Sequence, residues 1–126
     1  MDPVPPKPVV WLGRTRDELR EFPRRVRKEF GFALWLAQRG SAHPKTKTLH
    51  GFDGGGVIEI VQNASGNAYR TVYTVRWSGV IYVLHVFQKK STRGIKTPLP
   101  DRRLIDQRFR EAKQDYERRI AASKKR

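Results

Sequence analysis

Three apolar segments in the second half of the chain lie so close together that they constrain the fold more than any other feature. They cover residues 57–62, 69–77 and 80–88, and only short sequences rich in Asn, Ser and Gly separate them. β-branched and aromatic residues are frequent in all three, and connections this short join neighbouring antiparallel strands. The sequence therefore predicts a three-stranded antiparallel meander.

The first forty residues predict one more strand and two helices. Residues 8–13 indicate a short strand, and Thr15 with Glu18 forms the capping-box pattern that begins a short helix. A longer helix follows Pro23, because apolar residues recur there at helical spacing, and Gly40 is its expected end.

The rest of the chain predicts connections and a last helix. Residues 41–56 are expected to form a loop, in which three consecutive glycines make a flexible turn, and residues 92–100 a linker. Asp101 is the expected cap of an amphipathic helix that runs to residue 123. Together these elements describe an α+β fold with a small, mostly antiparallel sheet, made of the N-terminal strand plus the meander. We expect the helices to cover one face of this sheet and to leave the other open.

Charge is the strongest signal in the composition. Lys and Arg number 27 against 12 acidic residues, for a formal net charge of +15, and residues 89–126 carry 14 of these bases and 5 of the acids. Solubility needs far less charge, so the excess favours a polyanionic partner such as nucleic acid. By length and pattern, residues 9–123 are expected to form a single domain between a flexible, Pro-rich segment 1–8 and a basic tail 124–126.

Several function classes are disfavoured by what the sequence lacks. It has no Cys, which excludes disulfides and thiolate metal sites and fits a reducing compartment. The longest apolar run, residues 80–87, is too short to cross a bilayer, and no signal-peptide pattern begins the chain. We therefore expect a cytoplasmic protein with no membrane partner. The three histidines lack metal-ligand spacing, so neither a metal nor a cofactor is expected.

Strand alternation sorts the residues that could perform chemistry. Arg70 and Arg76 are expected on one face of the second meander strand, and His85 and Lys89 on one face of the third. Glu59 interrupts an apolar strand, so it must face solvent or be paired. Cleavage of RNA without a metal needs proton transfer, which Glu59 or His85 could supply, and cations on the phosphate, which Arg70 and Lys89 could supply. Further basic residues that could bind RNA are Lys45, Lys47, Arg76, Lys90 and Arg93.

The same residues also have purely structural interpretations. Arg70 and Glu59 could form an ordinary cross-strand ion pair, and His85 could be a core or edge histidine whose ring is hydrogen-bonded. Lys89 and Lys90 could simply be the solvated end of a strand. Spacing alone does not decide between these interpretations.

Longer motifs resemble a known family. The segment Ala68-Tyr-Arg-Thr-Val-Tyr73, followed by Phe87-Gln-Lys-Lys-Ser91 and Thr97-Pro98, resembles the phage-derived branch of the RelE/HigB toxins. The similarity extends from about Trp11 to about Ala112. It implies the compact RelE-like fold, cleavage of mRNA, commonly on the ribosome, and neutralisation by a small antitoxin that is usually a helix-turn-helix protein.

The resemblance also implies roles for individual residues. Arg70 matches an arginine that contacts the scissile phosphate, and Lys89 matches a basic residue that stabilises the transition state. The lysines of the preceding strand in RelE are replaced here by Val57 and Glu59, which makes Glu59 a candidate base or orienting group. The catalytic tyrosine of RelE has no counterpart. These losses leave open a non-catalytic member, either a ParE-like gyrase poison or a degenerate protein that only binds an antitoxin or nucleic acid.

Overall fold

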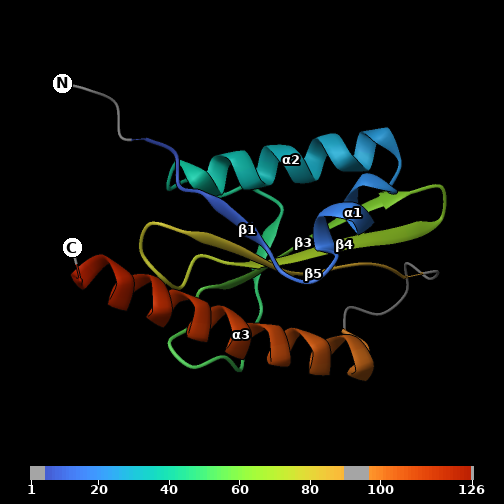
Figure 1. Cartoon of the computed structure of the whole chain (residues 1–126). Coiled ribbons are helices and arrows are strands. Elements are labelled where there is room, and N and C mark those ends of the chain that lie inside the picture. The colour runs from blue at the N-terminus through green and yellow to red at the C-terminus, as the bar shows by residue number, and fades with distance from the viewer. Residues whose placement is uncertain (1–4, 90–96, 126) are drawn as a thin grey trace.

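A computed structural model describes residues 5–89 and 97–125. The elements form three layers, with a sheet between two helices on one face and a third helix on the other (Figure 1). In chain order they are β1 (Val9–Trp11), α1 (Thr15–Arg20), α2 (Arg24–Gln38), β2 (Thr46–Thr48), β3 (Val57–Ala64), β4 (Asn67–Thr74), β5 (Ile81–Lys89) and α3 (Leu99–Lys124).

The sheet has the order β1-β5-β4-β3-β2. The predicted meander is confirmed as β3, β4 and β5, and β1 joins its edge in parallel to β5. The two-residue turn between β3 and β4 contains Ser65 and Gly66, whose φ angles of 51° and 80° suit the tight turn of a twisted hairpin. β2 lies within the segment predicted as a loop and adds a short antiparallel edge strand. The α+β class and the mostly antiparallel sheet are therefore confirmed.

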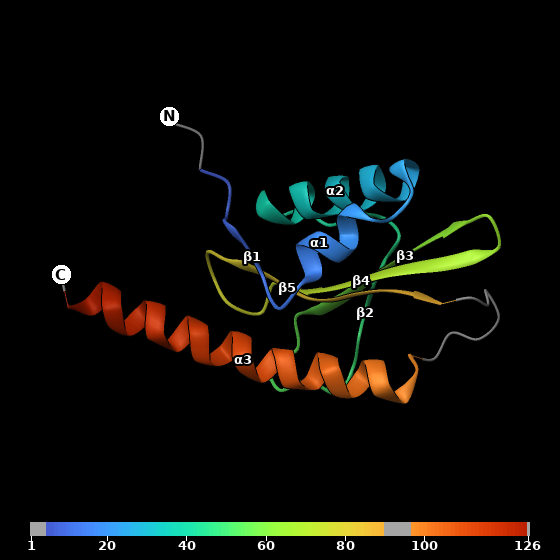
Figure 2. The ribbon, with the colours of Figure 1, turned by 45° about the vertical axis from the view of Figure 1, so that its right-hand side comes forward.

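The expectation of an open sheet face is wrong. The α3 helix covers that face, on the side opposite α1 and α2, as a second view of the ribbon also shows (Figure 2). The reason is that both faces of the meander are apolar, so each needs a helix to cover it. One core contains Val26 and Phe30 of α2 with Ile60 and Tyr73 of the sheet, and the other contains Ile105, Phe109 and Ala112 of α3 with Val57, Val72, Tyr82 and Leu84.

Two of the predicted helix caps are also wrong. Thr15 is fully buried, and its hydroxyl has no hydrogen-bond partner within the described residues. The third helix begins two residues before Asp101, after Pro98, which leaves the Asp101 side chain available for another contact. Gly40 does end α2 as predicted: its φ of 79° is left-handed, and its backbone N–H donates to the carbonyl of Ala37.

Polar contacts fasten α3 to the sheet. The buried hydroxyl of Tyr82 donates a hydrogen bond of 2.7 Å to Asp115, which also accepts one of 2.6 Å from Arg119. These two hydrogen bonds hold the pKa of the Asp115 carboxyl below its usual range, while burial and the neighbouring carboxylate raise the pKa of Tyr82. About two turns nearer the start of the helix, Arg108 donates to the carbonyl of Leu84 at 3.0 Å. The position of α3 over the sheet is thus fixed at several points.

The three consecutive glycines form a turn with a defined conformation. Gly54, Gly55 and Gly56 all have left-handed φ angles, of 80°, 68° and 77°. A Cβ on Gly56 would lie 2.8 Å from the Cα of Arg76, and the Gly56 carbonyl accepts a hydrogen bond of 2.9 Å from the Thr74 hydroxyl. The turn therefore needs glycine both for its backbone angles and for its close approach to the end of β4.

This close approach gives a first testable prediction. We expect Gly55→Ala to lower the free energy of unfolding by about 1–2 kcal/mol, because Ala disfavours the left-handed conformation but meets no atom there. Gly56→Ala should cost about 1–3 kcal/mol more, because its methyl group also collides with the Arg76 backbone. Urea denaturation of both variants measures the difference. Equal decreases in the free energy of unfolding for the two variants would show that the close approach of Gly56 to Arg76 does not contribute to stability.

Candidate active site

The antiparallel register brings three predicted site residues to the sheet face that α3 covers. Val72 of β4 lies directly opposite Glu59 of β3 and His85 of β5. Glu59 and His85 therefore lie on the same sheet face as Val72. Two residues before Val72 on β4, Arg70 lies opposite Phe87 on the same face. Alternation along each strand predicted part of this arrangement, and the pairing of the strands completes it.

A β-bulge decides on which face His85 lies. The pairing of β4 with β5 shifts at one point, so that Tyr73 faces Val83 while the preceding Val72 faces His85, and Leu84 is the extra residue. Without this extra residue Val72 would face Leu84, and His85 would turn toward α1 and α2. Bulges often re-aim a side chain in this way beside a functional site.

Arg70 and Glu59 form an ion pair in the interior. Arg70 Nη1 lies 3.5 Å from Glu59 Oε2, and the two side chains are only 4% and 8% exposed. The structural interpretation of these two residues as a cross-strand ion pair is therefore confirmed, although the pair runs diagonally across the strands. Because both charges are buried, the contact between them offsets part of the cost of removing them from water.

His85 is held by the carboxylate of Asp101, which the sequence predicts as a helix cap. Its Nε2 lies 2.8 Å from Oδ1 of Asp101, in the first turn of α3. A carboxylate only accepts, so in the neutral ring the proton is on Nε2 and Nδ1 is a base. Nδ1 has no hydrogen-bond partner within the described residues, and His85 is 6% exposed. The interpretation of His85 as a hydrogen-bonded core histidine is confirmed, and the contact adds Asp101 to the site.

Phe87 connects the two polar pairs. Its ring stacks on that of His85, with centroids 4.7 Å apart and an angle of 15° between the planes. The Phe87 ring also neighbours Arg70, whose guanidinium carbon lies 6.0 Å from the ring centroid. A continuous series of contacts thus runs from Glu59 through Arg70, Phe87 and His85 to Asp101, which we call the Arg70–His85 cluster.

Lysines lie at the edges of this cluster. Lys89, at the end of β5, is half-buried and lies opposite Ala68, on the same face as Phe87. Lys47 lies on the edge strand opposite Glu59 and is exposed. Lys45 is exposed just before that strand. Cations therefore flank the cluster along both the β2 and the β5 edges of the β3–β5 meander.

Arg76 lies elsewhere than expected. Because β4 ends at Thr74, Arg76 does not share a strand face with Arg70, and it lines a separate cavity beside Trp77. The predicted RNA-binding residues Lys90 and Arg93 lie outside the described residues. Among the residues that the structure does describe, no group of three or more His, Asp or Glu side chains is arranged to hold a metal ion.

A mostly antiparallel sheet between two N-terminal helices and one C-terminal helix is compatible with the small RelE-like fold. Residues 17–110, about three-quarters of the chain, match the family described as Phage derived protein Gp49-like (DUF891). The chain therefore belongs to this phage-derived, toxin-like family, which is related to RelE/HigB. Nothing among the curated proteins or the solved structures matches it. None of the helices in residues 5–89 and 97–125 is long and apolar enough to span a membrane.

Proposed function

We propose that this protein is the toxin of a type II toxin–antitoxin pair and acts as an mRNA endoribonuclease that needs no metal and works on translating ribosomes. The observation that carries the proposal is the contact between His85 and Asp101. It leaves one ring nitrogen as a base, within the same cluster as a buried arginine. Membership in a toxin-like family and the strongly basic chain support the same conclusion.

The chemistry would use the 2′-hydroxyl of the substrate as the nucleophile. His85 Nδ1 takes the proton from this hydroxyl, and the 2′-oxygen forms a bond to the adjacent phosphorus. The bond from phosphorus to the 5′-oxygen breaks, the leaving oxygen takes a proton from water, the resulting hydroxide takes the proton held by His85, and a 2′,3′-cyclic phosphate remains. Arg70 and Lys89 stabilise the charge on the five-coordinate phosphate, and Glu59 orients Arg70 through their ion pair.

Access to the cluster is part of the proposal. Arg70 and His85 are 4% and 6% exposed, so an RNA strand reaches them only when the surrounding groups open locally. The first turn of α3 closes one side through Asp101. Lys47 and Lys89, at the edges of the cluster, are the cations that a phosphate would meet first. Opening would then align the scissile phosphate with the guanidinium.

The partners follow from charge and from the family. Residues 89–126 carry 14 basic residues, and the exposed ones on α3 would dock on ribosomal RNA, with binding that falls steeply as salt rises. A toxin-like family implies a cognate antitoxin. We propose that this antitoxin is a small helix-turn-helix protein encoded next to the toxin.

Growth of cells that express the protein tests the proposal. We expect induction of the wild type to arrest growth, and co-expression of the adjacent small reading frame to restore it. Lys89→Ala should abolish the arrest, while Lys28→Ala, an exposed lysine on α2 at the opposite sheet face, should not. Arrest with intact mRNA and damaged DNA would instead identify a ParE-like gyrase poison.

A further inference from the structure

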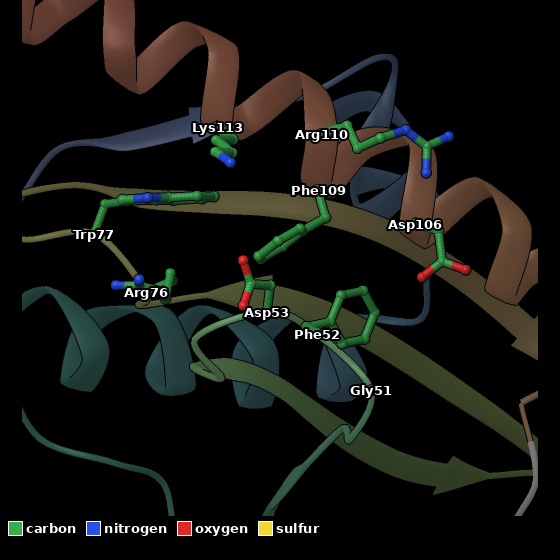
Figure 3. A pocket seen from close by; sticks show the side chains of 9 residues that line it. All are labelled: Gly51, Phe52, Asp53, Arg76, Trp77, Asp106, Phe109, Arg110 and Lys113. Carbon is green, nitrogen blue, oxygen red and sulfur yellow. The ribbon is translucent and has the colours of Figure 1, made fainter.

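A cavity of about 300 Å³ lies under the middle of α3, away from the Arg70–His85 cluster. Three segments far apart in the sequence line it: the loop around Phe52, the connection after β4 around Trp77, and one face of α3 around Phe109 (Figure 3). Phe109 is in contact with both other rings, at centroid distances of 5.1 Å to Phe52 and 5.2 Å to Trp77. Three aromatic rings, with Phe109 in contact with the other two, therefore line part of the cavity.

The walls are held in place by specific contacts. Arg102 of α3 donates a hydrogen bond of 2.8 Å to the carbonyl of His50 and lies 4.3 Å above the ring of Phe52. At the other end of the same loop, Gly56 packs against the backbone of Arg76. The loop is thus fastened to α3 on one side and to the sheet on the other. Such a preformed concave site is typical of small-ligand pockets.

Acidic and basic side chains lie around the aromatic rings of the cavity. The Asp53 carboxylate points inward toward the Phe109 ring, and Lys113 lies above it on α3 (Figure 3). Arg76 lies at the rim beside Trp77. Aromatic walls stack with a base, and cations at the rim bind its phosphate. An ionised carboxylate only accepts hydrogen bonds, so it selects a base edge with adjacent N–H donors.

Guanine is the base that fits this pattern. Its Watson–Crick edge presents N1–H and the N2 amino group side by side, so both can donate to the two oxygens of one carboxylate. Adenine presents an acceptor beside its amino group at that edge, and uracil presents a single N–H between two acceptors. We propose that this cavity binds one unstacked guanine nucleotide of an RNA strand, with Asp53 reading the base, Trp77 stacking on it, and Arg76 and Lys113 holding its phosphate.

The cavity and the cluster lie on one side of the molecule. Phe109 follows Asp101 by eight residues along α3, which is about 12 Å of helix. A guanine bound here is therefore separate from the nucleotide that is cut, and one bound strand can supply both. The choice of RNA as the ligand rests on the proposed function, whereas the preference for guanine rests on the cavity alone.

Binding of a short labelled strand, followed by fluorescence anisotropy, tests this inference. The probe is a 2′-O-methyl oligoadenylate in which one position is guanine, compared with the same strand without guanine. It carries no 2′-hydroxyl nucleophile, so the assay does not depend on cleavage. We expect the wild type to bind the guanine strand about tenfold more tightly, as one bidentate base contact allows. Asp53→Asn should reduce this preference to within about twofold.

Matched variants separate this site from the proposed active site. Asp17→Asn makes the same change at an exposed position on α1 and should leave the preference intact. His85→Gln should also retain the preference while losing cleavage. Equal affinity of the wild type for both strands, or a preference that survives Asp53→Asn, would overturn the guanine site and leave the proposed nuclease untouched. Loss of the preference in His85→Gln would equally overturn it, by assigning recognition to the cluster.

Discussion

Arg70→Ala is expected to lower the free energy of unfolding by about 3–5 kcal/mol, because it leaves Glu59 as an uncompensated charge in the interior. A loss of that size is a large part of the stability of a small domain, which is about 5–15 kcal/mol. Urea denaturation measures it. Loss of toxicity in this variant would therefore reflect loss of the fold as much as loss of a catalytic cation.

A double variant separates the two effects. Combining Arg70→Met with Glu59→Leu removes both charges and refills their volume, so it should recover much of the stability that Arg70→Ala loses. The protein should then be folded but unable to cleave RNA. A double variant no more stable than Arg70→Ala would show that the ion pair does not account for the cost. Arg70→Lys provides a second comparison, since it keeps the charge and loses the two-pronged guanidinium.

His85→Gln is expected to lower the rate constant of RNA cleavage by about 10²- to 10⁴-fold, the usual contribution of a general base. Glutamine can still donate an N–H to Asp101, so the fold and the position of α3 should be retained. Asp101→Asn should give a loss of the same order, because an amide N–H directed at Nε2 places the ring proton on Nδ1. In both variants KM should change little, because neither residue is proposed to bind the RNA.

Asp17→Asn is the matched control for this prediction. Asp17 is exposed on α1, so it has no part in orienting His85. Nitrogen NMR of the imidazole reports the tautomer directly: the wild type should carry its proton on Nε2. A proton on Nδ1 in the wild type, or full activity in His85→Gln, would remove His85 from the mechanism.

Local patterns predicted most of the fold. The meander and the two long helices follow from apolar periodicities that burial on the sheet or on a helix face enforces. β2 could not be predicted in this way, because Thr46–Thr48 has no apolar residue and is a strand only through its pairing with β3. The covered sheet face was missed for a similar reason. Whether α3 folds back over the meander depends on tertiary packing, which no local window contains.

The site was predictable only in part. Alternation correctly placed His85 and Lys89 on one face of β5, and it gave Arg70 and Glu59 as a pair. The bulge at Leu84 has no local signal, although it decides which face His85 joins. Asp101 was assigned to a helix cap because that is the commonest role of Asp near a helix start. The aromatic cavity combines three segments that are well separated between residues 51 and 113, so only the folded chain reveals it.

Cleavage of mRNA in a translating cell-free extract, mapped by primer extension, tests the central claim most directly. Wild type, His85→Gln and Lys89→Ala would be compared on the same message, with a parallel reaction on naked mRNA. We expect discrete in-frame cuts by the wild type that require ribosomes and disappear in both variants. An intact message in the presence of folded, antitoxin-free wild type, or the same cuts in both variants, would contradict the assignment of this protein as an RNA-cleaving toxin that acts through the Arg70–His85 cluster.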